Sequence, residues 1–167
     1  IDYLKRLLGN GNKVLIVSKP SYKCIKTICD SFGEYKDSIL FRFTIGSTNS
    51  ETLRFWEPNA PDYKERKKAL IYAFKAGFQT SISCEPMLDD RADHVIDDLS
   101  SYVTDAIWLG KMNFAIRRLR TNGQLNIETQ AAAERILQWQ SDDNIKDLYK
   151  RYKNNPLIKW KESIKKV

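Results

Sequence analysis

Apolar residues along the first two thirds of the chain follow two periods, and these predict strands that alternate with helices. Short runs of apolar and branched residues predict the strands, which cover 13–18, 39–47, 78–84 and 105–110. Between these runs, apolar side chains recur three and four residues apart, as they do on one face of a helix. Such alternation predicts parallel strands joined by right-handed crossovers through the helices.

Polar residues and glycine indicate where the predicted helices begin and end. Asp62 is followed three residues later by Glu65, a spacing that resembles a capping box. Gly77 is expected to end that helix, because glycine adopts the positive φ that a helix end often requires. Asp89 or Asp90 is expected to cap the next helix.

The last third of the chain has helical periodicity and no predicted strand. Its two apolar faces are Ala132, Ile136 and Trp139, then Ile145, Leu148, Tyr149 and Tyr152. We expect a single domain over 1–167, with βα units in 1–113 and a helical C-terminal extension in 114–167. Four parallel strands do not close a barrel, and a doubly wound sheet does not need to close, so the pattern leaves both architectures open.

Composition favours a folded domain and argues against several kinds of site. The chain of 167 residues is 42% hydrophobic and 11% aromatic, and it has no membrane-length apolar run. Its first residues are expected to form a helix and not a signal peptide. Its three cysteines and one histidine argue against a disulfide framework or a zinc site. Cys29 falls on an apolar helix face and is expected to be buried. A reducing cytoplasm is the natural compartment for such thiols.

The net charge of +7 raises the possibility of an anionic partner. Basic residues gather in 111–120 and 146–166. They fit either a solvated surface or a nucleic-acid partner. No aromatic-interleaved RNA motif and no recognition helix accompanies them.

Polar residues at the ends of three predicted strands are the candidate ligand contacts. Lys19 follows the first strand, where its ammonium could hold a carboxylate or phosphate or could belong to an ordinary loop. Thr44 and Ser47 end the second strand, and their hydroxyls suit a ligand or a hydrated barrel interior. Glu85 ends the third strand, where it could bind a ligand amine or pair with Lys19 or Arg42.

Alternation within the second strand predicts its two faces. Arg42, Thr44 and Gly46 share one face, and Phe41, Phe43 and Ile45 share the other, which should pack against helices. Glu57 precedes a proline in a tight loop, where we expect a structural role. His94 is expected to be a solvated surface residue, and no glycine-rich nucleotide motif follows any strand.

An ordered series of motifs resembles radical SAM proteins, most closely the branch that contains spore photoproduct lyase. The motifs lie between Leu4 and Asn113, and they are Ser18-Lys19-Pro20, Phe41-Arg42-Phe43-Thr44-Ile45, Phe55-Trp56-Glu57-Pro58, Ala60-Pro61, Arg66, Ala76-Gly77-Phe78 and Glu85-Pro86-Met87. The resemblance implies an α/β fold, a partial (β/α) barrel with parallel strands, followed by C-terminal helices. It also implies a 4Fe-4S cluster and S-adenosylmethionine, which is cleaved reductively to generate a substrate radical.

The resemblance assigns roles to few residues of this chain. Lys19 matches a lysine that contacts the methionyl carboxylate, and Thr44 matches a hydroxyl residue that contacts S-adenosylmethionine. Ser47, Cys84 and Glu85 are neighbours of the cofactor by position alone. The CxxxCxxC cluster motif is absent, so two further strands and the cluster ligands are expected before Ile1, and this fragment alone is expected to be inactive.

An unknown substrate and an external electron donor are the implied partners. The alternative is a basic nucleic-acid-binding or DNA-repair-related domain that uses the barrel as a scaffold. Under either interpretation no membrane partner is expected.

Overall fold

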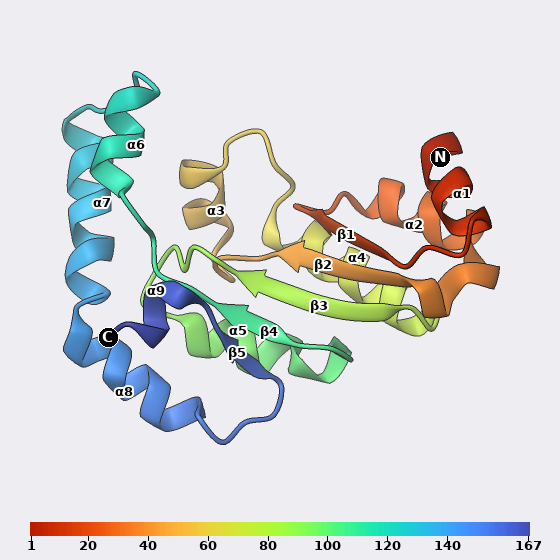
Figure 1. Cartoon of the computed structure of the whole chain (residues 1–167). Coiled ribbons are helices and arrows are strands. Elements are labelled where there is room, and N and C mark those ends of the chain that lie inside the picture. Colours follow the sequence, from red (N-terminus) through yellow and green to blue (C-terminus); the bar gives the residue numbers. More distant parts are fainter.

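The computed structural model describes all residues, 1–167, and its centre is one sheet of five parallel strands (Figure 1). The strands are β1 Val14–Ser18, β2 Ile39–Thr44, β3 Gln79–Cys84, β4 Ile107–Leu109 and β5 Ile158–Trp160. Their spatial order is β1-β2-β3-β4-β5, and every neighbouring pair is parallel. The parallel strands predicted from the alternating periods are therefore confirmed.

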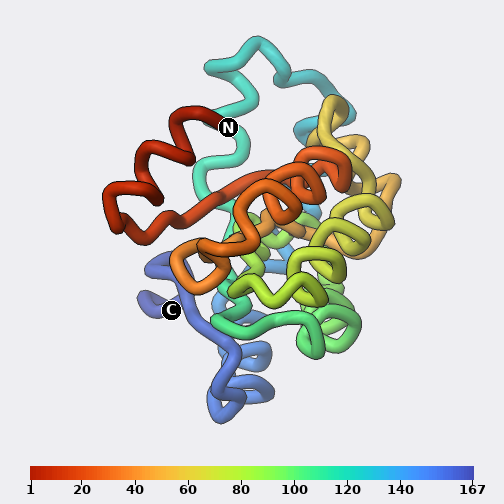
Figure 2. Tube along the Cα trace, turned by 90° about the vertical axis from the view of Figure 1, so that its right-hand side faces the viewer, coloured from red at the N-terminus to blue at the C-terminus, as the bar shows by residue number.

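Nine α-helices surround or extend the sheet. They are α1 Asp2–Gly9, α2 Tyr22–Ser31, α3 Ser50–Trp56, α4 Tyr63–Lys75, α5 Ala92–Leu99, α6 Ala115–Thr121, α7 Ile127–Trp139, α8 Asp142–Tyr152 and α9 Glu162–Lys165. Two short 3-10 helices, Gly33–Ser38 and Ser100–Tyr102, precede β2 and follow α5. Figure 2 shows α2 beside α4 in the helix layer.

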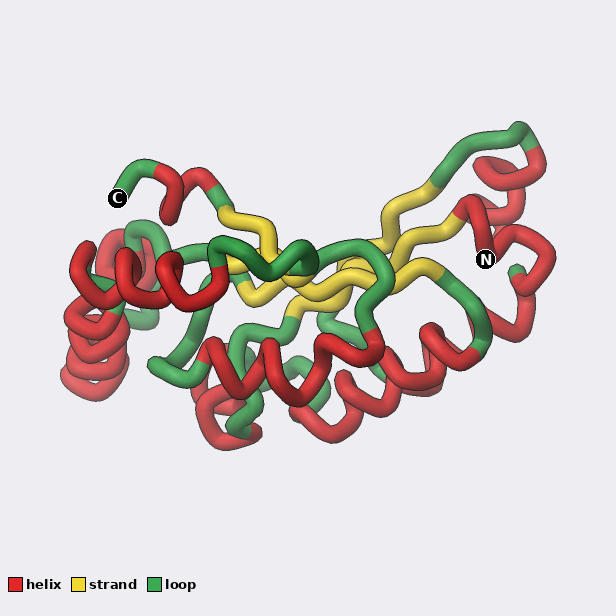
Figure 3. The backbone as a smooth tube through the Cα atoms, turned by 90° about the horizontal axis from the view of Figure 1, so that it is seen from below, coloured by secondary structure: helices red, strands yellow, loops and turns green.

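The strand order decides between the two architectures that the sequence leaves open. A doubly wound sheet reverses its order and carries helices on both faces. Here the order never reverses, and the helices that connect β1 to β4 lie on one side of the sheet (Figure 3). The α/β class with C-terminal helices is confirmed, and the arrangement is that of an open segment of a β/α barrel.

Strand β2 shows how the sheet divides its two faces. Phe41 and Phe43 are fully buried against the helix layer, whereas Arg42 and Thr44 alternate with them and are only partly buried. Burial of each phenylalanine contributes about 2–3 kcal/mol. The predicted division of this strand is confirmed, and the face with Arg42 and Thr44 has no helix layer over it.

Strand β5 is the main element that the periodicity does not reveal. It has only three residues, follows the Asn154–Pro156 break, and pairs with β4. A strand this short has too few alternating positions for a recognisable period. The C-terminal segment is therefore helical apart from this strand, which completes the sheet edge.

The predicted helix caps are confirmed at one helix and wrong at another. Asp62 accepts a hydrogen bond from the Glu65 N–H at 2.9 Å, but the Glu65 carboxylate accepts one from the Tyr22 N–H, so the capping box is not closed. At α5 the N-cap residue is Arg91, and neither Asp89 nor Asp90 caps the helix. The Asp89 carboxylate instead binds groups of its own loop and of the loop after β2.

Candidate functional site

All four predicted contact residues lie where parallel strands end. Lys19 follows β1, Thr44 ends β2, Ser47 lies in the next loop, and Glu85 follows β3. Parallel strands end at the same edge of their sheet, which is the edge that the arrowheads face in Figure 1. The structure therefore brings the four residues to one edge. The side chains of Lys19, Ser47 and Glu85 each have a partner within the protein, whereas Thr44 is bound through its backbone carbonyl.

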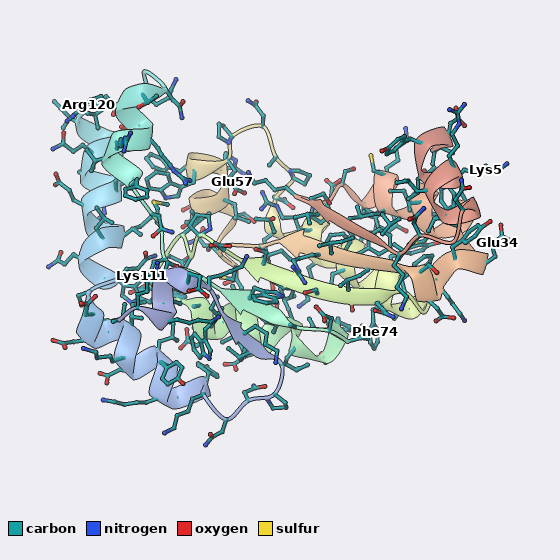
Figure 4. All side chains as sticks on the ribbon, viewed as in Figure 1. Lys5, Glu34, Glu57, Phe74, Lys111 and Arg120 are labelled. Carbon is teal, nitrogen blue, oxygen red and sulfur yellow. The ribbon has the colours of Figure 1, made fainter.

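Lys19 is part of a charged chain with a buried centre. Its Nζ lies 3.2 Å from Glu57 Oε1, and the other carboxylate oxygen of Glu57 lies 2.6 Å from the Arg66 guanidinium. Glu57, labelled in Figure 4, follows the last turn of α3 and is almost fully buried, and Arg66 is completely buried. The Lys19 side chain is 44% exposed, so its ammonium retains free donors for a ligand.

Arg66 explains why a loop with two prolines has a defined position at this edge. Its guanidinium also donates to the Pro61 carbonyl at 2.7 Å and to the Thr44 carbonyl at 3.1 Å. One buried side chain thus joins the end of β2 to the loop between α3 and α4. The structural role expected for Glu57 is confirmed, because its carboxylate neutralises this guanidinium.

Ser47 is occupied within the protein. Its side chain is fully buried, its hydroxyl donates to the Asp89 carboxylate, and its oxygen accepts the Asn49 N–H at 2.8 Å. Asp89 also accepts the Arg91 N–H at 2.9 Å. These bonds hold the loops after β2 and β3 together. Ser47 is therefore a buried structural residue of this edge and is not free to bind a ligand.

Glu85 pairs with a residue that the sequence did not indicate. Its carboxylate lies 2.9 Å from Lys161 Nζ, and not beside Lys19 or Arg42. Gly110 at the end of β4 makes this possible, because a Cβ there would lie 2.8 Å from Glu85 Cγ. Glu85 and Lys161 are each 31% exposed and can both reach a ligand.

Trp108 lies between two cations on the face without helices. The Arg42 guanidinium lies 5.0 Å from its ring centre, and Lys161 Nζ lies 5.2 Å away. Arg42 also donates to Ser81 and pairs with Asp105 at 3.3 Å. Cations at these distances are attracted to an indole ring. Thr44 on β2 lies opposite Ser83 on β3, and Ser83 lies opposite Trp108 on β4, so these three residues form one row across the sheet.

Backbone contacts between the loops make this edge a fixed scaffold. The Leu88 N–H donates to the Gly46 carbonyl at 2.9 Å, and the Met87 N–H donates to the Gly110 carbonyl at 3.0 Å. A Cβ at Gly46 would lie 2.5 Å from the Pro86 carbonyl oxygen, so only glycine allows these loops to approach. The Gln140 side chain, from the end of α7, donates to the Met87 carbonyl.

The cysteines are separated and do not fit a cluster site. Cys24 is exposed on α2, whereas Cys29 and Cys84 are buried. Burial raises the pKa of the Cys29 thiol to about 12 and raises the pKa of Cys84 further. No three residues among the single histidine, the cysteines and the carboxylates are grouped to hold a metal ion. The residues of this chain therefore supply no ligand set for the 4Fe-4S cluster of the resemblance.

The sequence indicated the candidate contact residues but not the side chains that bind them in the folded protein. Lys161 and Trp108 lie on or beside short strands, and Asp89 was expected to cap a helix. The apolar and aromatic content of Leu157-Ile158-Lys159-Trp160, directly after the Asn-Asn-Pro break, is the one signal that could have indicated β5 and hence Lys161.

The fold and edge define an α/β protein with an open, singly wound parallel sheet and polar strand ends. Comparisons with protein families, characterised proteins and solved structures match nothing. No helix is both long and apolar enough to serve as a transmembrane span.

Proposed function

We propose that this chain is the C-terminal part of a radical SAM enzyme and contributes to S-adenosylmethionine binding at the strand ends, with a substrate still to be found. The supporting observation is the unreversed parallel sheet, whose carboxyl edge carries Lys19, Thr44 and Glu85 together. Ligands of β/α barrels bind at this edge.

The chemistry of these residues fits the amino-acid end of S-adenosylmethionine. The partly exposed Lys19 ammonium would bind the carboxylate, while the Thr44 hydroxyl and the Glu85 carboxylate would accept from the ligand ammonium. When bound to a reduced cluster, S-adenosylmethionine supplies a radical that abstracts hydrogen. Because the cysteines here do not fit a cluster, its ligands and the electron donor would come from outside these residues. A cytoplasmic location suits the free thiols.

Titration calorimetry with S-adenosylmethionine tests this proposal. We expect Lys19→Ala to weaken binding by about 10- to 100-fold, since a charged hydrogen bond contributes about 1.5–3 kcal/mol. Lys13→Ala is the matched control, because it removes the same charge at the opposite end of β1. Equal affinities of the Lys19 variant and the unaltered protein would refute the assignment.

A nucleic-acid scaffold is the second candidate, favoured by the open face of the sheet. There Arg42 and Lys161 flank Trp108, a combination that suits a phosphate backbone with a stacked base. Binding of a single-stranded DNA oligonucleotide should then weaken steeply between 50 and 200 mM salt. Arg42→Gln with Lys161→Gln should remove most of this binding, whereas Lys13→Ala should not.

A further inference from the structure

A cavity of about 570 Å³ lies beside the strand ends, between α3, the loop after β3, and α7. Figure 1 shows α7 standing beyond the strand ends on the side toward α3. None of the four predicted contact residues lines this cavity. Its volume is in the range of about 300–1,000 Å³ that accommodates small organic ligands.

The floor and walls of the cavity are apolar and largely aromatic. Leu88, Ala132 and Ile136 are buried at its base. Trp56 and Trp139 contribute indole rings from opposite helices, and Phe55 packs edge-on against Trp56, with ring centres 5.1 Å apart. Aromatic faces carry negative charge density and attract cations within about 6 Å.

The rim of the cavity is acidic although the chain as a whole is basic. Glu51, Asp90 and Glu128 line it as exposed carboxylates, and Arg135 is the single cation. None of these four side chains forms an ion pair within the protein. Their electrostatic interactions are therefore available to a ligand.

We propose that this cavity binds an organic cation, a substituted ammonium or guanidinium group carried on an apolar body. The apolar body would occupy the floor, and the cation would lie between the aromatic walls and the three rim carboxylates. The ligand is either a free amine or a lysine or arginine side chain of a polypeptide, which present the same chemistry. The cavity adjoins the strand-end residues through Asp89, which lines it and whose carboxylate accepts the Ser47 hydroxyl, but the proposal does not rest on S-adenosylmethionine binding.

The tryptophan distribution provides a direct measurement. Trp56 and Trp139 line the cavity, whereas Trp108 and Trp160 lie on the sheet. Phenethylammonium is titrated while the four indole N–H signals are followed by NMR, with 2-phenylethanol as the neutral isostere. We expect the signals of Trp56 and Trp139 to shift and those of Trp108 and Trp160 to stay. The ammonium should bind about tenfold more tightly than the alcohol.

Rim variants test the electrostatic component. Glu51→Gln, Asp90→Asn and Glu128→Gln combined should weaken ammonium binding about tenfold and leave alcohol binding unchanged. Glu134→Gln, on the same helix but outside the cavity, is the matched control, and Arg135→Gln should tighten ammonium binding. Lys19→Ala should leave this titration unchanged even where it weakens S-adenosylmethionine binding.

A pair of peptides distinguishes a free amine from a lysine side chain as the source of the cation. The pair is Ac-Gly-Lys-Phe-Gly-NH2 and the same peptide with glutamine in place of lysine, which removes the charge. Tighter binding of the lysine peptide than of phenethylammonium would indicate a polypeptide ligand, and the reverse order a free amine. The proposal would be overturned by equal binding of ammonium and alcohol, by shifts confined to Trp108 and Trp160, or by rim variants that bind the ammonium unchanged.

Discussion

At the scale of the residue, the buried pair of Glu57 and Arg66 links separate segments of the candidate edge. Arg66 has no exposed surface, and its donors are divided among one carboxylate and two carbonyls. A carboxylate buried without its partner is costly, because the protein interior solvates charge poorly. Arg66 therefore fixes the end of β2 through the Thr44 carbonyl. It also holds the Glu57 carboxylate in the position where it pairs with Lys19.

Arg66→Met should destabilise the protein by about 3–5 kcal/mol, the cost of breaking a buried ion pair from one side. Urea unfolding followed by circular dichroism measures the change. Adding Glu57→Leu to this variant should recover part of the loss, because no charge then remains unpaired. A loss below about 1 kcal/mol for Arg66→Met would show that the pair does not stabilise this edge.

At the scale of the element, Asp98 joins two helices of the outer layer. Its carboxylate on α5 accepts hydrogen bonds from Lys67 and from the Tyr63 hydroxyl, both on α4. The bond from Lys67 and then that from Tyr63 lower the pKa of Asp98. Burial, followed by the bond to Asp98, raises the pKa of Tyr63.

The lowered pKa of Asp98 predicts an acid-dependent contribution to stability. The folded pKa lies below the unfolded value of about 3.9, so the contribution is complete above that value and is lost as the pH falls through the folded pKa. Asp98→Asn should lower the urea midpoint at pH 7, and the difference from the unaltered protein should shrink toward pH 3. Asp97→Asn, at the neighbouring exposed position, is the control. A difference that is constant from pH 7 to pH 3 would contradict this role.

At the scale of the whole molecule, the singly wound sheet leaves one face and one edge of β1 open. Val17 and Leu15 alternate with the residues that pack against the helices, and their side chains are 57% and 47% exposed. An edge strand with exposed apolar side chains favours pairing with another chain.

We expect the protein to self-associate as its concentration rises, and Leu15→Lys with Val17→Lys to reduce that association. Charged side chains on an edge strand oppose pairing between sheets. Light scattering coupled to size-exclusion chromatography gives the mass of each species. Leu137→Lys changes an exposed leucine on α7 and serves as the control. Identical masses for the edge variant and the unaltered protein at high concentration would exclude β1 as the contact.

Much of the fold was predictable because its signals are local. The alternation of Phe41 with Arg42 follows from the two-residue period of a strand, and six of the helices follow from apolar spacing. The short helices α3, α6 and α9 were not predicted. Lys19, Thr44 and Glu85 could be placed at one edge because parallel strands all end there. Strand β5 was not predictable in this way, since three residues carry almost no period.

The sequence by itself determined the α/β class, the parallel strands, the two faces of β2 and the polar ends of three strands. The tertiary structure alone decided the unreversed strand order, the pairing of Glu85 with Lys161 and of Lys19 with Glu57, and the cavity between α3 and α7. The physical reason is range. Helices and strands are encoded by neighbours a few residues apart, whereas ion pairs and cavities depend on how segments distant along the chain pack.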